Sequence, residues 1–392
     1  PKTPFKGHFS AGRVGTFDEP VGGGEVGEEG IGGEGEPGPE DSIEASDDGE
    51  EIYYNITNVT ITDSFDYRGM FGYVEGSVLK NLTVSGAVYG GGDYTGGIVG
   101  YVGPGTSLED CTSQVAVSGT NYVGGLVGYA APAEGREISF KNCINQGDVT
   151  ATASNVGGVV GRVYNHNPYG WLSLARVSFS DCVNEGDITG GTSNTGGIAG
   201  ELRSYVFNEF STCRNSGDIQ GGSYTGGIVG RGSAPTTEEP INEVNFKDCI
   251  NVGTITGEAS NTGGVAGYLS GPVSLEYCFN TGPIQSDSGD NVGGVVGYTS
   301  GTLRTLKDCY NTGNVTGKKI AGGVIASLGG GSQAVTPVVT KCYNTGKISS
   351  DGYTGGVFGS VGDLFLDQIT FCYNRGKIEA GGDYAGGIVA YL

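Results

Sequence analysis

Three aspartates of this chain are candidate ligands for a cation. Asp148, Asp187 and Asp218 each follow a Cys-x-Asn-x-Gly segment directly. If these segments are stacked structural units, the three carboxylates lie above one another and could share a Ca²⁺ ion, which prefers carboxylate oxygens. The alternative is that they are solvated turn residues. No cluster of Arg or Lys accompanies them, which argues against catalysis by this group.

A second candidate site is aromatic. Residues 164–171 read Tyr-Asn-His-Asn-Pro-Tyr-Gly-Trp and contain the only tryptophan of the chain. Exposed aromatic side chains can stack on sugar rings or anchor a protein partner. The alternative is that these rings pack on each other and hold a long loop in place. The candidate ligand-binding residues are Tyr164, His166, Tyr169, Trp171 and, at the corresponding place in the next unit, Tyr205.

The cysteines and asparagines recur at fixed places. One cysteine occurs per unit, the number is odd and no Cys-x-x-Cys pair exists, so the pattern favours a column of buried, small apolar thiols over disulfides or a metal site. The nine are Cys111, Cys143, Cys182, Cys213, Cys249, Cys278, Cys309, Cys342 and Cys372. Two residues after the cysteine stands an asparagine, or Ser113 in the first unit. Asparagine tolerates the left-handed backbone conformation and can hydrogen-bond to its own copies, so we expect a second column that shapes a turn.

The units that must position these residues are marked by a glycine phrase. Gly-Gly, two apolar residues and then Gly or Ala occur ten times, and a degenerate copy precedes them at Gly69. The copies begin at Gly96, Gly124, Gly157, Gly196, Gly226, Gly263, Gly293, Gly322, Gly355 and Gly386. Such self-similarity indicates stacked units.

Each unit contains short β-branched runs bounded by Gly, Asn, Asp and Ser, which is typical of strands. We therefore predict an all-β parallel β-helix, a β-solenoid of about eleven coils of 28–39 residues, with three short strands per coil and a right-handed winding. The aliphatic third residue of the phrase should point into the core and the sixth into solvent. The glycine between them should leave room for the bulky residue three positions before each cysteine. Insertions fall between the phrase and the cysteine strand, so they should project from one edge.

The composition divides the chain and limits its partners. Residues 1–51 form a lead-in or cap with an acidic, Gly-rich insertion at 18–51, and residues 52–392 form the β-helix. The net charge of −22 argues against nucleic acid as a partner. No apolar run is long enough for a membrane span, so no membrane insertion is expected. We expect a monomer.

The Gly96–Val102 phrase and the Cys-x-Asn-x-Gly-x-Ile-x-Gly segment resemble the GLUG-motif repeats of bacterial cell-surface proteins. Gly69-Met70-Phe71-Gly72 is close to the form that names the motif. The resemblance covers residues 52–392 and implies a secreted or surface-displayed bacterial adhesin that binds a host or microbial glycan or a surface protein. Similar repeats occur in bacterial immunoglobulin A metallopeptidases, which carry catalysis on an HExxH domain. This chain has no HExxH motif, so no catalytic residue is expected.

Two alternatives to an adhesin remain open. The rod could be a structural stalk or spacer of a larger surface protein, which needs no ligand. It could also cleave acidic polysaccharides, as many right-handed β-helices do with clustered carboxylates and basic residues. The residues before successive cysteines test the enzyme interpretation. Acids alternate with other residues there, which argues against a catalytic cluster.

Overall fold

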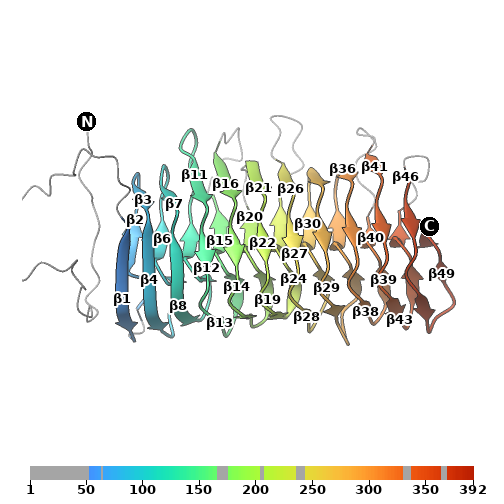
Figure 1. The fold of residues 1–392 in the computed structure, drawn as a ribbon, viewed down its shortest axis with the longest axis horizontal. Coiled ribbons are helices and arrows are strands. Elements are labelled where there is room, and N and C mark those ends of the chain that lie inside the picture. Colours follow the sequence, from blue (N-terminus) through green and yellow to red (C-terminus); the bar gives the residue numbers. More distant parts are fainter. Residues whose placement is uncertain are drawn as a thin grey trace, which may run out of the picture.

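The computed structural model describes residues 53–62, 65–165, 175–203, 207–234, 243–329, 337–362 and 369–392. In these ranges the chain is a parallel β-solenoid of about ten turns, in which strands and connections alternate without helices. Figure 1 shows the coils following one another along a rod, from β1 at one end to β49 at the other. None of the described residues forms a helix long and apolar enough to cross a membrane. The predicted fold class is confirmed.

The strands of the glycine phrase form one wall of the rod. Its main component is the eleven-stranded sheet A, made of β2 (Phe71–Val74), β6 (Val99–Val102), β10 (Val127–Ala130), β15 (Val160–Tyr164), β20 (Ala199–Arg203), β25 (Val229–Ser233), β30 (Ala266–Ser270), β35 (Val296–Ser300), β40 (Ile325–Leu328), β45 (Phe358–Val361) and β50 (Val389–Tyr391). A ladder of shorter strands, sheet C, precedes it in each coil: β5 (Thr95–Gly96), β9 (Val123–Gly124), β14 (Ser154–Gly157), β19 (Ser193–Gly196), β24 (Ser223–Gly226), β29 (Asn261–Gly263), β34 (Asn291–Gly293), β39 (Ile320–Gly322), β44 (Tyr353–Gly355) and β49 (Ala385–Gly386).

The strands before and after the cysteines form the other two walls. Sheet D holds β3 (Val78–Lys80), β7 (Ser107–Glu109), β11 (Ile138–Lys141), β16 (Arg176–Ser180), β21 (Phe207–Ser211), β26 (Val244–Lys247), β31 (Val273–Glu276), β36 (Leu303–Lys307), β41 (Val338–Thr340) and β46 (Ile369–Thr370). Sheet B holds β1 (Tyr54–Ile61), β4 (Leu82–Tyr89), β8 (Thr112–Gly119), β12 (Ile144–Asn145), β13 (Val149–Ala151), β17 (Val183–Asn184), β18 (Ile188–Thr189), β22 (Arg214–Asn215), β23 (Ile219–Gly221), β27 (Ile250–Asn251), β28 (Ile255–Gly257), β32 (Phe279–Asn280), β33 (Ile284–Gln285), β37 (Tyr310–Asn311), β38 (Val315–Gly317), β42 (Tyr343–Asn344), β43 (Ile348–Ser350), β47 (Tyr373–Asn374) and β48 (Ile378–Ala380).

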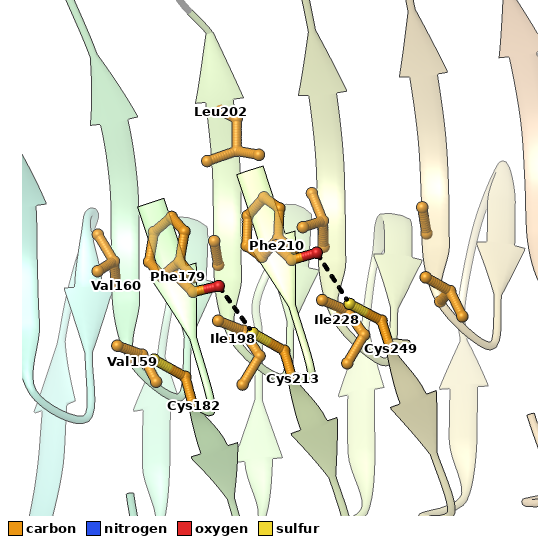
Figure 2. Packing of buried hydrophobic residues seen from close by; sticks show 14 of the residues in the cluster. Val159, Val160, Phe179, Cys182, Ile198, Leu202, Phe210, Cys213, Ile228 and Cys249 are labelled. Carbon is orange, nitrogen blue, oxygen red and sulfur yellow. Dashed lines mark hydrogen bonds between the residues drawn. The ribbon is translucent and has the colours of Figure 1, made fainter. Parts of the chain in front are cut away.

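The core lies between these walls and is built from the predicted positions. The third residue of each phrase is fully buried, except for the half-buried Ile388 in the last coil. Opposite it, the rings of Phe140, Phe179, Phe210 and Phe246 stack on one another at centroid distances of 4.5–5.0 Å. Figure 2 shows Phe179 and Phe210 beside the aliphatic side chains of the facing wall. The inward assignment of both positions is confirmed.

The cysteine column is also as predicted. All nine thiols are free, and all but Cys372 are buried. Cys213 donates its S–H to the carbonyl of Phe179 at 3.5 Å, and Cys249 donates to that of Phe210 at the same distance (Figure 2). Burial raises the pKa of the Cys111 thiol to about 11. A neutral thiol is neither a good nucleophile nor a good metal ligand, which fits a structural role for Cys111.

The asparagine column forms one continuous chain of hydrogen bonds. Each side-chain amide donates to the Oδ1 of the asparagine in the next coil at 2.6–2.8 Å, from Asn145 through Asn374. Each amide also donates to the carbonyl of the glycine two residues later in its own coil. The predicted hydrogen bonding between copies is confirmed.

The predicted backbone conformation of these asparagines is wrong. The left-handed residue of this corner is the one before each cysteine, for example Asp110 (φ +52°), Asn142 (φ +48°) and Tyr277 (φ +56°). The asparagine itself lies in a short strand of sheet B, because its side chain must point inward to meet its copies. The turn is therefore made three residues earlier than the asparagine pattern suggested.

The role expected for the fifth residue of the phrase is also wrong. A Cβ at Gly128 would lie 2.6 Å from the backbone nitrogen of Thr95 and 2.6 Å from the carbonyl carbon of Tyr94. The space beside this glycine is thus filled by the backbone of sheet C in the preceding coil, and not by a bulky side chain from another wall. The glycine allows the two parts of the first wall to approach closely.

Candidate binding surface

The connections that vary most in length join a strand of sheet A to the following strand of sheet D. They range from residues 271–272, between β30 and β31, to residues 165–175, between β15 and β16. Connections from sheet B to sheet C vary less, from residue 222 alone to residues 286–290. In Figure 1 the sheet D strands that follow these connections, such as β16 and β26, begin at the upper edge. The insertions were predicted to project from one edge of the rod. The described strand ends on either side of them, in sheets A and D, confirm that they start and end at the same edge. We call this side the loop edge.

Of the predicted aromatic residues, the structure describes Tyr164. It ends β15 and lies half-buried, with the guanidinium of Arg162 4.5 Å from its ring centroid. Because residues 162 and 164 are two apart in one strand, both point to the outer face of sheet A. Tyr164 therefore leads from the outer face of sheet A into the loop edge. His166, Tyr169, Trp171 and Tyr205 lie outside the described residues.

The three predicted cation ligands are brought into register on successive coils, and all three are exposed. Oδ1 of Asp148 accepts the backbone N–H of Asp187 at 3.1 Å, and Oδ1 of Asp187 accepts that of Asp218 at 2.9 Å. Asp218 in turn accepts the N–H of Thr254 at 2.8 Å. Each carboxylate thus accepts, through one of its oxygens, a hydrogen bond from the backbone of the next coil. This bond contributes to the contact between the two coils. Within the described part of the chain, no group of three or more His, Cys, Asp or Glu side chains is arranged to hold a metal ion. Binding of Ca²⁺ by these aspartates stays a prediction.

The most pronounced surface feature is a group of six tyrosines that the sequence analysis did not single out as a site. They occupy two positions of three successive coils. In the two coils with a complete phrase these are its sixth residue and the residue two before its first glycine, and in the first coil they are the residues in register with these. We call this group the tyrosine zipper: Tyr67, Tyr73, Tyr94, Tyr101, Tyr122 and Tyr129.

The two rows of the zipper pack against each other. In the sheet A row, Tyr101 stacks on Tyr73 at 5.1 Å and on Tyr129 at 5.3 Å. In the corner row, Tyr94 stacks on Tyr67 at 4.8 Å and on Tyr122 at 5.0 Å. Between the rows the contacts are edge to face, at centroid distances of 5.2–6.3 Å. Both geometries are favourable for aromatic pairs, so the six rings form one ordered surface.

Four of the phenols in the zipper have a raised pKa. Burial raises the pKa of Tyr73 to about 12, and the hydrogen bond from its hydroxyl to Glu75 Oε2, 2.7 Å long, adds to that shift. Burial likewise raises the pKa of Tyr94, Tyr101 and Tyr129. The surface therefore carries neutral hydroxyl groups that can both donate and accept hydrogen bonds.

Along sheet A the tyrosine row continues into charged residues. In register with Tyr129 come Arg162, Glu201 and Arg231 on the next three coils. Glu201 Oε2 lies 2.8 Å from Nε of Arg162, and its Oε1 lies 3.8 Å from Nη1 of Arg231. Nη1 of Arg162 also donates to the hydroxyl of Tyr122 at 3.2 Å. The planar guanidinium groups thus extend the aromatic row, and Glu201 is covered by them although it lies on an outer face.

One hollow lies on the outer face of sheet D. It encloses about 330 Å³ between β21, β26 and β31, and its lining includes Glu209, Glu243, Glu276 and Lys247. Ser274 donates its hydroxyl to Glu243 at 2.6 Å. One of its lining residues, Glu243, directly precedes β26.

Comparisons with known proteins name no relative. No family model matches the chain, and neither a curated protein nor a solved structure shows significant similarity to it. The function is therefore argued from the surface alone. The zipper could have been found in the sequence, because tyrosine occupies both of its positions in three successive units. It was missed because the sixth position changes to Arg, Glu and Ser in later units and was classed only as solvent-facing.

Proposed function

We propose that this chain is a non-catalytic, adhesin-like β-solenoid that recognises a glycan or a surface protein. The observation that supports this most directly is the tyrosine zipper, an ordered outer surface of six rings on a rod whose core is filled by other residues. Tyrosine contributes a large, rigid contact area with a polar tip, which makes it a frequent binding residue. Tyr164 extends this chemistry toward the loop edge.

The resemblance to GLUG-motif repeats supports placement on a bacterial surface or in a secreted protein. The net charge of −22 fits a partner that is not nucleic acid. A solenoid suits display, because its inner ladders support the rod while the outer face and one edge remain free to vary.

The stalk interpretation is the second candidate, and a specific observation favours it. The faces of the zipper rings are covered by each other, which is what a purely structural stack would require. A polysaccharide-cleaving enzyme remains the third candidate. It predicts release of new sugar ends from an acidic glycan, and loss of that release when Asp148, Asp187 or Asp218 is replaced by Asn.

The test is an array of glycans and extracellular-matrix proteins probed with the whole chain, with and without Ca²⁺. We expect a reproducible hit that weakens at least tenfold in a Tyr94→Ala/Tyr101→Ala variant, since such anchors each contribute about 1 kcal/mol or more. A Tyr169→Ala/Trp171→Ala variant tests the loop separately. Absence of binding under both conditions would reject the adhesin proposal in favour of a stalk.

A further inference from the structure

The tyrosine zipper has a direction, because its two rows run along the rod axis. Each row places one phenol per coil, with ring centroids 4.8–5.3 Å apart. This repeat is the spacing of neighbouring strands. A ligand that uses several of these phenols at once must therefore be extended, lie along the rod and repeat at nearly the same distance.

The chemistry of the zipper favours hydroxyl-rich ligands. Among the described residues, the phenol oxygens of Tyr94, Tyr101 and Tyr129 have no hydrogen-bond partner, so they are available to a ligand. Each can donate one hydrogen bond and accept others. Because the ring faces are covered by neighbouring rings, a ligand meets ring edges and hydroxyls. Recognition then depends on hydrogen bonds repeated once per coil.

The charge around the zipper argues against an anionic ligand. Asp66 and Asp93 lie beside the corner row, where Oδ1 of Asp66 accepts the N–H of Asp93 at 2.9 Å. Glu75 lies beside the sheet A row, where it accepts from Tyr73 and pairs with Arg136 at 2.9 Å. Arg162, in register with Tyr129 on the next coil, is likewise paired with Glu201. These two cations are thus neutralised, while Asp66 and Asp93 repel acidic sugars and accept hydrogen bonds from sugar hydroxyls. A neutral ligand fits this surface better than a uronate or a sulfated sugar.

We propose that the tyrosine zipper binds a neutral β-1,4-linked glucan chain that lies parallel to the rod axis, with one sugar unit per coil. An extended β-1,4-linked chain advances by nearly one coil spacing per sugar, and each of its units carries hydroxyls toward both sides. The inference rests on the proposed binding function and names its ligand. An extended peptide lacks this match, because it presents side chains of changing size and only two backbone groups per residue.

A second tyrosine stack in the same molecule provides a matched control. On sheet B, Tyr310, Tyr343 and Tyr373 stack on one another at 4.7–4.9 Å. This stack is a single row, and lysines Lys347 and Lys377 with Glu379 form ion pairs on the same wall. It offers phenols at the same spacing without the paired row and without the acidic surroundings.

The test is calorimetric titration of the whole chain with cello-oligosaccharides of increasing length. We expect the affinity to rise up to about three sugars, one for each coil of the zipper, and then to level off. Tyr101→Phe removes one oxygen and keeps the ring stack, so it should weaken binding of the longer oligosaccharides about fivefold. Tyr343→Phe should leave the binding unchanged, and both variants should unfold at the temperature of the parent chain.

Other results would overturn the inference in distinguishable ways. If cello-oligosaccharides do not bind but a protein on the array does, and Tyr101→Phe abolishes that hit, the zipper is a protein-docking surface and the adhesin proposal stands. If chito-oligosaccharides bind and cello-oligosaccharides do not, the ligand assignment is wrong. If an array hit depends on the loop and not on Tyr101, the site assignment is wrong. No binding to any probe rejects the inference and the proposed function together.

Discussion

The inner asparagine column and the outer tyrosine row run parallel through the same rod, and they differ in how they change along it. The inner column keeps asparagine in eight successive coils, from Asn145 to Asn374. The outer row changes from tyrosine to Arg162, Glu201 and Arg231, returns to tyrosine for two coils and then changes to serine. Inside, the side chains between the two ends of the column are bonded to their own copies above and below, so a single change removes a buried hydrogen bond from both neighbours. Outside, water can replace a lost partner, and the residue is free to serve binding.

The largest loss of stability should come from adding a methyl group in the narrow space beside the asparagine column. A Cβ at Gly227 would lie 2.1 Å from the carbonyl oxygen of Gly264 and 2.6 Å from Cγ of Asn251. Both atoms belong to stacked coils that cannot move apart without breaking a sheet. We expect Gly227→Ala to lower the free energy of unfolding by about 4 kcal/mol, at the upper end for one substitution. Denaturant unfolding followed by circular dichroism measures it.

The control occupies the same position in the last coil. Gly387 is the second glycine of its phrase, and a Cβ there would meet no atom within 4 Å. Gly387→Ala should leave the unfolding midpoint unchanged. If both substitutions were equally harmful, the cost would come from the backbone conformation of this position and not from the contact between coils.

The next largest loss of stability should come from removing one asparagine from the middle of the column. Asn251 accepts from Asn215 at 2.7 Å and donates to Asn280 at 2.6 Å and to the carbonyl of Gly253 at 2.9 Å. Asn251→Ala removes one buried hydrogen bond from each of these three groups, although the amide of Asn215 keeps its bond to the carbonyl of Gly217. Since each such group costs about 1–3 kcal/mol, we expect a loss of about 3 kcal/mol.

Asn374→Ala is the matched substitution at the end of the column. Asn374 is half-buried and accepts from Asn344 at 2.8 Å. Water can reach this position, so the loss should be about 1 kcal/mol. Equal losses at Asn251 and Asn374, measured by the same unfolding experiment, would contradict the view that burial between copies makes the column intolerant to change.

The sequence predicted the interior better than the surface. The reason is that the inner positions repeat the same residue in nearly every coil, whereas the outer positions change. A residue repeated at one place in every unit, such as Cys213 or Asn215, reports a contact with its own copies, so periodicity was enough to find both columns. The left-handed corner was misplaced because its residues differ between units, from Asp110 to Tyr277, and share only a backbone angle. The tyrosine zipper depends on two positions that meet across a corner, and nothing in the spacing alone indicates that Tyr94 lies against Tyr101.

The smallest change in stability should come from a substitution at that left-handed corner. There the residue type varies between coils, while the backbone angle φ stays near +50°. Lys341 is exposed and has a φ of +56°. This conformation costs most residues about 1–2 kcal/mol, but it costs asparagine less. In an earlier coil Asn142 occupies the same position and donates from Nδ2 to Oδ1 of Asp110 at 2.8 Å. Asp308 stands in the place of Asp110 one coil before Lys341, so Lys341→Asn should gain both the backbone preference and the hydrogen bond. We expect the free energy of unfolding, measured with denaturant, to rise by about 0.5 kcal/mol.

Lys141→Asn, an exposed change in β11, should give no gain, because asparagine is disfavoured in strands. A loss of stability in Lys341→Asn would show that the lysine side chain contributes more to this wall than the backbone angle does.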